Sequence, residues 1–126
     1  MAMTIGEAAR LTGLTIHTLR FYDELGLLPQ VKRAGNGHRA FDEDVLGWIN
    51  ILKCLRATQM PLADMQRFTR LAHQDANTLT QQRELLEAHR REIAQRMAEV
   101  EAAIEMIDHK IEYIREAEAE QTVAGS

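Results

Sequence analysis

Cysteine is almost absent from this 126-residue chain, which contains only Cys54. One cysteine cannot form a disulfide within the chain. It also cannot complete a zinc site of four cysteines, or of two cysteines and two histidines. The chain lacks any apolar run near the ~20 residues that span a bilayer. Its first ten residues, MAMTIGEAAR, lack the basic head and apolar stretch of a signal peptide. We therefore expect a cytoplasmic protein with no membrane partner and no cofactor.

Proline is also scarce, and glycine is unevenly distributed. Pro29 and Pro61 lie where helical patterns stop, and six of the seven glycines lie in the first half. Residues 77–119 contain neither residue type and are rich in Ala, Glu, Gln, Arg and Ile, which predicts one long helix. We predict a mainly α fold with a compact domain over residues 1–75, a dimerisation helix over 76–120 and a flexible tail over 121–126.

Two short helices are predicted at the start of the chain. Thr4 and Glu7 have the spacing of a capping box, and Gly13 can adopt the left-handed conformation that a tight turn needs. Thr15 is an N-cap candidate for a second helix that runs through Leu25 and stops at Gly26. Two short helices joined by a glycine-containing turn are typical of a helix-turn-helix. Many capped helix pairs never contact DNA, so this pattern alone leaves the function open.

A basic hairpin is predicted over residues 28–41. Asn36-Gly37 is a favoured hairpin turn, and the flanking residues carry Lys32, Arg33, His38 and Arg39. A two-stranded basic hairpin beside a helix-turn-helix is a wing, which places cations on phosphates that flank the groove. The alternative is a solvated loop with ordinary surface cations.

A third helix is expected from an Asp42 N-cap to about Thr58, and a fourth from Leu62 to about Ala72. The third helix has two apolar stripes on roughly opposite sides, which indicates that two surfaces cover it. One stripe contains Val45, Trp48, Ile49, Leu52 and Leu55, and the other Gly47, Ile51, Cys54 and Thr58. A partner subunit is a natural cover for the second stripe.

Heptad spacing in the long helix predicts a coiled coil. Apolar residues recur every seven positions at 79, 86, 93, 100, 107 and 114, and Met97, Ile104 and Ile111 fill the alternate position. Arg83 and Arg90 make the first part of this seam polar. A second chain is required to bury such a seam, so we predict a dimer.

Several of these strings resemble the MerR family of bacterial transcription regulators. The resemblance rests on residues 4–9 (TIGEAA), residues 15–28 (TIHTLRFYDELGLL) and residues 37–41 (GHRAF), and it covers about residues 4–75. Phe41 departs from the family pattern, which more often has tyrosine there. The resemblance implies a winged helix-turn-helix homodimer with an antiparallel coiled coil. Such a dimer binds a palindromic promoter operator, distorts the DNA and thereby controls RNA polymerase.

The resemblance also implies which residues contact DNA. By position it assigns Arg20, Tyr22 and Arg39 chiefly to phosphates, and His17 and Thr18 to base edges. Arg20 has the alternative of pairing with Asp23 or Glu24, and Tyr22 that of being mostly core. The complete predicted set is Thr15, His17, Thr18, Arg20 and Tyr22 on the recognition helix, with Arg33, Asn36, Gly37 and Arg39 on the wing.

Cys54 is the candidate effector-sensing residue. The string around it is similar to the subgroup of the regulators NmlR and AdhR, which respond to aldehydes and thiol stress through a cysteine in this helix. A thiolate attacks electrophilic carbon, and cations at Lys53 and Arg56 would favour the thiolate if they lie close. The alternatives are a small buried hydrophobe, a non-thiol effector, or zinc shared across the dimer with a histidine.

Other functional classes find less support in the sequence. The chain has no glycine-rich phosphate loop and no paired histidine and carboxylate motif, so we predict that it is not an enzyme. A net charge of −4 would by itself argue against DNA binding, but the charge is distributed unevenly along the chain. Residues 1–75 have nine Lys and Arg against eight Asp and Glu, so the acidic excess belongs to the long helix. A coiled-coil module whose head binds protein remains the alternative function.

Overall fold

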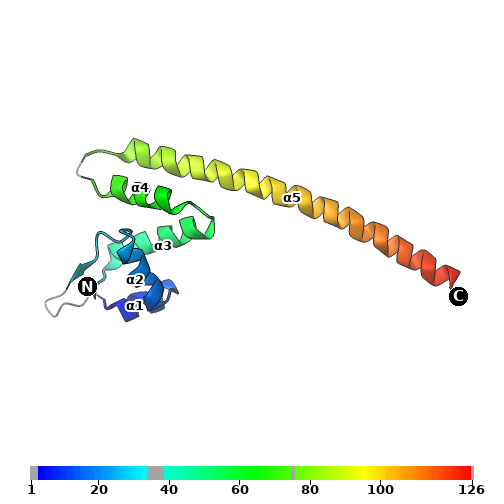
Figure 1. Ribbon diagram of the computed structural model, residues 1–126, viewed down its shortest axis with the longest axis horizontal. Helices are drawn as coiled ribbons and strands as arrows, with labels where there is room; N and C mark the ends of the chain where they lie inside the picture. The colour runs from blue at the N-terminus through cyan, green and yellow to red at the C-terminus, as the bar shows by residue number, and fades with distance from the viewer. Residues whose placement is uncertain (1–2, 34–38, 75, 126) are drawn as a thin grey trace. The chain divides into compact units, whose positions relative to one another are not determined.

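The computed structural model describes residues 3–33, 39–74 and 76–125. The chain divides into two compact units, Met1–Glu87 and Ala88–Ser126. The first unit contains the short helices and the hairpin, and the last helix runs from the first unit into the second. Figure 1 shows the order of these elements along the chain.

The two N-terminal helices begin and end where the sequence predicts. Helix α1 (Ile5–Thr12) has the complete capping box of Thr4 and Glu7, and Gly13 follows it with a φ of 74°. Helix α2 (Ile16–Glu24) begins at Thr15, whose hydroxyl accepts the Thr18 N–H at 3.0 Å. The buried Thr12 hydroxyl donates to the Ala8 carbonyl within α1 at 2.8 Å and accepts the Leu14 N–H of the turn at 3.4 Å. These bonds confirm the predicted helix-turn-helix.

The wing consists of β1 (Lys32–Arg33) and β2 (Arg39–Ala40), which pair antiparallel with Lys32 opposite Ala40. Met3 adds an antiparallel bridge to Phe41, so the N-terminal segment continues the pairing beyond β2. The Phe41 ring is buried in the core. The predicted Asn36-Gly37 turn lies outside the described residues.

Helices α3 (Glu43–Ala57) and α4 (Leu62–Ala72) agree with the predicted boundaries, and Asp42 caps α3 by accepting the Val45 N–H at 2.9 Å. The core unites α3 with residues from α1, α2, α4 and the segment that leads to the wing. It contains Ala8, Leu19, Tyr22, Leu27, Leu28, Phe41, Val45, Ile49, Leu52, Leu55, Met65 and Phe68. Along the second stripe of α3, Gly47, Ile51 and Cys54 are exposed and Thr58 is half-buried. Within the described residues, the core therefore covers the first apolar stripe of α3, and the predicted cover of the second stripe is not part of it.

Helix α5 (Leu79–Ala124) is longer than predicted at its C-terminal end. It continues past residue 120 because no helix breaker precedes Gly125, so the expected flexible tail over 121–126 is helical as far as Ala124. The compact first unit also reaches beyond residue 75, since Leu85 and Leu86 on α5 pack against the core. No helix among the described residues is both long enough and apolar enough to cross a membrane.

Gly13 offers a test of the turn between α1 and α2. We expect Gly13→Ala to lower the free energy of unfolding by about 1 kcal/mol, because a side chain strains a residue at positive φ. A Cβ there meets the Lys53 Nζ at only ordinary contact distance, 3.7 Å, so crowding adds little.

The matched control is Gly47→Ala inside α3, where a Cβ meets nothing within 4 Å. Alanine in a helix interior is favoured over glycine by about 1 kcal/mol, so this variant should be more stable. Urea denaturation at one protein concentration measures both changes. Equal stability of the Gly13→Ala variant and the wild type would contradict the strained-turn account.

Candidate nucleic-acid interface

The start and outward face of α2 carry four of the nine predicted DNA contacts. His17 and Arg20 are exposed, Thr15 is exposed at the helix start, and Thr18 is half-buried. Thr15 and Thr18 are joined hydroxyl to hydroxyl at 2.9 Å, which fixes the side chains of the first turn. The N–H groups of a helix N-terminus attract anions such as phosphate. The face therefore presents a cation, an imidazole and hydroxyls on one rigid turn.

Phe21 is a residue that the sequence analysis did not assign. Its ring is 44% exposed, although aromatic rings of this size are usually buried. Phe21 is four residues after His17, so the two side chains share one face of α2. An apolar ring on such a face can contact the methyl group of thymine. The signal in the sequence was the adjacent pair Phe21-Tyr22, of which only one ring can face the core.

Tyr22 is the ring that faces the core. It is 1% exposed, and the Arg56 guanidinium lies over it at 5.9 Å from the ring centroid. This burial favours the alternative that Tyr22 is mostly core over a direct contact with a phosphate. Its aromatic ring instead supports a cation, since a guanidinium is attracted to the face of a ring.

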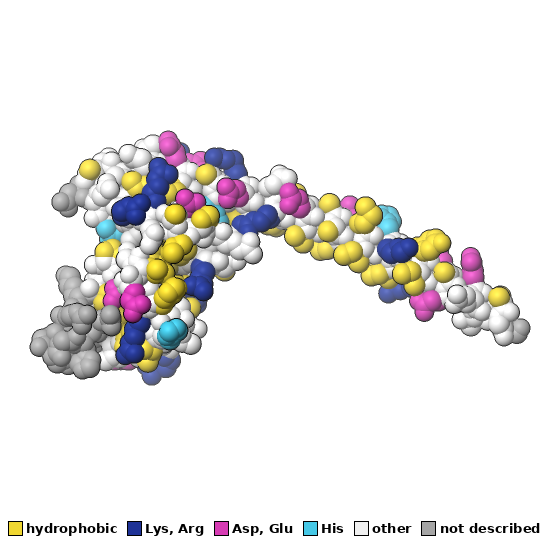
Figure 2. Space-filling model, in the orientation of Figure 1, with side chains coloured by type: hydrophobic (Ala, Val, Ile, Leu, Met, Phe, Trp, Pro, Cys, Tyr) yellow, Lys and Arg dark blue, Asp and Glu magenta, His cyan; other side chains and the backbone are white. Residues whose placement is uncertain are grey.

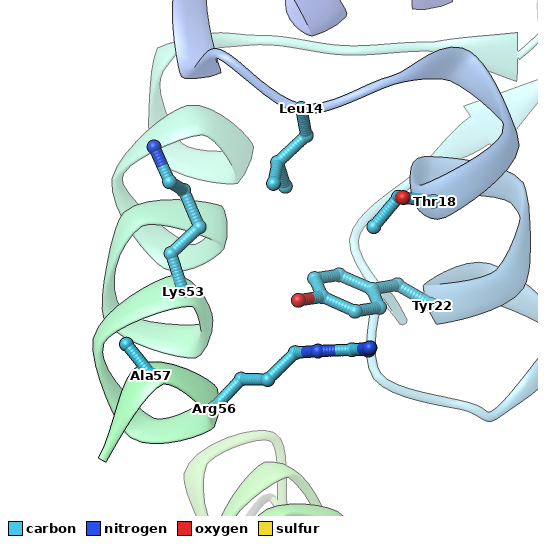
Figure 3. A pocket seen from close by; sticks show the side chains of 6 residues that line it. All are labelled: Leu14, Thr18, Tyr22, Lys53, Arg56 and Ala57. Carbon is cyan, nitrogen blue, oxygen red and sulfur yellow. The ribbon is translucent and has the colours of Figure 1, made fainter. Parts of the chain in front are cut away.

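A hollow of about 380 Å³ lies between α2 and α3, lined by Leu14, Thr18, Tyr22, Lys53, Arg56 and Ala57. In Figure 3, Arg56 extends from α3 beneath the Tyr22 ring, whereas Lys53 runs upward alongside α3. The Lys53 ammonium donates to the Thr12 carbonyl at the end of α1. Arg56 thus lies beside Tyr22 in the C-terminal half of α2, and Lys53 reaches the end of α1. The sequence analysis considered these two cations only in relation to Cys54.

The wing residues are placed by their backbone. Arg33 and Arg39 lie opposite each other on the paired strands β1 and β2. Their side chains, together with Asn36 and Gly37, lie outside the described part of the chain. The predicted wing contacts therefore remain predictions that rest on the hairpin and its composition.

Cys54 has a free, exposed thiol on α3. The cations that were expected to favour its thiolate have other partners, because Lys53 bonds to Thr12 and Arg56 lies over Tyr22. The side chain is exposed in the single chain, on the stripe of α3 for which a partner subunit is the expected cover. Among the described residues, no three His, Cys, Asp or Glu side chains are grouped as a metal site requires.

Comparison with known sequences identifies relatives along almost the whole chain. The family profile described as MerR family regulatory protein matches residues 4–41. An uncharacterized HTH-type transcriptional regulator of Haemophilus influenzae is 33% identical over 119 residues, which is 94% of this chain and 88% of the relative. The HTH-type transcriptional regulator AdhR of Bacillus subtilis is 33% identical over 91 residues, covering 72% of this chain and 65% of AdhR.

Solved structures give the same result. HiNmlR, a MerR family regulator lacking the sensor domain and crystallised with promoter DNA, is 33% identical and covers 94% of both chains with a TM-score of 0.83. A MerR family transcriptional regulator from Bacillus thuringiensis is 30% identical, covers 88% of this chain and 97% of its own, and has a TM-score of 0.78. The similarity therefore includes the short helices, the wing and most of the long helix.

Proposed function

The chain belongs to the MerR family of regulatory proteins, and from this premise we propose that it binds a palindromic promoter operator as a homodimer and distorts the DNA. It is a DNA-binding transcription regulator with a winged helix-turn-helix. The observation that supports the proposal most strongly is the exposed face of α2, which carries His17 and Arg20. The DNA-bound structure of the similar protein HiNmlR is consistent with this role.

Contacts with DNA would divide between two kinds of residue. His17 and Thr18, on the outward face of α2, would reach base edges in the major groove. Arg20 and Arg56, together with Arg33 and Arg39 of the wing, would bind phosphates and fix the orientation of the domain. Tyr22 is omitted from this set because it is buried.

The homodimer is supported by the seam of α5. Met97, Val100, Ile104 and Ile107 are all more than half exposed, and Ile111 and Ile114 are only slightly less so. Figure 2 shows hydrophobic side chains in a band along this helix. An apolar stripe with heptad spacing is stable in water when a second helix covers it. We propose that a second copy covers it in an antiparallel coiled coil, and that the dimer acts on RNA polymerase at the same promoter.

Cys54 supports an electrophile-responsive regulator. An exposed thiol can be reached by an aldehyde, which a buried one cannot. The chemistry would be addition of the thiolate to the carbonyl carbon, which forms a thiohemiacetal after the oxygen takes up a proton. A regulator with a non-thiol effector is the alternative.

The test of operator binding is footprinting on the intergenic DNA upstream of the gene, with a protected palindrome as the expected result. Arg56→Ala should weaken binding and lower the slope of log K against log salt by about one, because one phosphate contact is lost. Arg39→Ala tests the wing in the same way.

The matched control is Arg115→Ala, which removes an exposed arginine from α5 and should leave the slope unchanged. Wild-type protein that binds this DNA no better than random DNA would refute operator binding. That outcome would favour a coiled-coil module whose head binds protein.

The dimer is tested on the seam. Ile104→Lys should convert the protein to a monomer in analytical ultracentrifugation, because a charge would be buried between the helices. Met106→Lys introduces the same charge at a position that is off the seam and 74% exposed, so it should remain a dimer. If the Ile104→Lys protein were still dimeric, the seam would not be the interface.

The sensor is tested by replacing Cys54 with serine. Wild-type protein should change its promoter output when formaldehyde or methylglyoxal is added, and Cys54→Ser should not, because a serine hydroxyl is a far weaker nucleophile. Operator binding without the aldehyde should be equal for both proteins. An undiminished response of Cys54→Ser would show that the effector acts elsewhere.

A further inference from the structure

The segment that joins the recognition helix α2 to the wing is bonded to side chains from two later helices. The Leu25 carbonyl accepts the Gln66 Nε2–H of α4 at 2.9 Å, and the Leu27 carbonyl accepts the Trp48 Nε1–H of α3 at 2.8 Å. Gly26, between them, has a φ of 78° and turns the chain. Leu25 is the C-cap of α2, and its carbonyl has no partner within the helix, so the Gln66 bond holds the C-terminal end of α2. The Trp48 bond holds the chain two residues further on.

Helix α4 also fixes the indole that makes the second bond. The Trp48 ring stacks on Phe68 with ring centroids 5.3 Å apart and an angle of 11°. The His73 ring meets its edge at 4.9 Å, and His73 is itself bonded through Nδ1 to the Thr69 carbonyl at 2.8 Å. Both hydrogen bonds to the segment after α2 therefore depend on side chains of α4. Gln66 belongs to α4 and makes its bond directly, and the bond of Trp48 depends on Phe68 of α4, which holds the indole ring.

A surface hollow of about 350 Å³ lies between the segment and α4, lined by Gly26, Pro29, Thr69, Arg70, His73 and Gln74. Beneath the surface, Leu27 and Leu28 of the segment belong to the same buried core as Met65 and Phe68 of α4. Apolar packing is not directional, so the two hydrogen bonds add a defined orientation to this packing.

We propose that Gln66 and Trp48 are positioning residues for DNA recognition, which set the orientation of α2 relative to the wing and connect it to α4. This inference rests on the proposed function. Base-edge contacts need accurate placement of α2, while flexible Arg and Lys side chains reach phosphates from a range of placements. Loss of either bond should therefore lower the preference for the operator more than it lowers binding to DNA in general.

The experiment compares Gln66→Met with the wild type. Methionine keeps the length of the side chain and removes the donor, so the Leu25 carbonyl loses its partner. We expect the ratio of operator to random-DNA affinity to fall about fivefold, the effect of one lost hydrogen bond. The salt slope should be unchanged, because no phosphate contact is removed.

Gln81→Met is the matched control, since it makes the same substitution at an exposed position of α5 and should leave the ratio unchanged. Trp48→Phe is the second variant, because phenylalanine keeps an aromatic ring against Phe68 and loses the N–H donor. A Gln66→Met protein with a lower melting temperature but the wild-type ratio would show a merely structural role and overturn the inference.

A second readout does not require DNA. The chain has one tryptophan, so the indole N–H of Trp48 gives a single resonance in a ¹⁵N-labelled sample. Gln66→Met should shift that resonance and Gln81→Met should not, because the Leu27 carbonyl moves when the segment is released. An unshifted Trp48 resonance in the Gln66→Met protein would overturn the inference, whatever the DNA measurements show. A wild-type protein without operator preference would by itself refute only the proposed function.

Discussion

The structure depends on a constraint that applies to any helix that reads DNA, namely that one of its faces must stay exposed. Helix α2 has nine residues and buries only Leu19 and Tyr22 among them. These two side chains are almost completely buried and anchor the inner side of a helix that is too short to be stable in water by itself. Bonds at its two ends add a defined orientation to this anchoring. Thr15 caps the start, Lys53 bonds to the carbonyl just before the turn, and Trp48 and Gln66 hold the carbonyls beyond the end.

Much of this fold could be predicted from the sequence because its signals are local. The capping box at Thr4, the left-handed Gly13, the Asp42 cap and the heptads of α5 each act over a few residues, and each is found where it was expected. The boundary predicted at residue 120 falls short of the end of α5 at Ala124, because a chain with no glycine or proline continues a helix until Gly125.

The functional surface was predictable only in part, since it depends on contacts between residues far apart in the chain. Helical spacing places Tyr22 on the buried side with Leu19, three residues before it, but it gave no role to Phe21, whose ring the structure leaves 44% exposed. The same limit applies to Lys53 and Arg56, which the sequence places beside Cys54. In the structure their partners belong to residues 12 and 22, which no local pattern connects to them.

Helix α5 continues without a break from the first unit into the predicted dimer seam. Leu85 and Leu86 pack in the core of the first unit, and the strong part of the seam begins at Ile93 on the same helix. A second copy that held the seam would also restrain the turns that support the head, so association and folding would be coupled by mass action. The abundance of such a regulator in the cell would then influence its own lifetime. At low copy number the separated chains would expose an apolar helix to proteases, and accumulation would protect them.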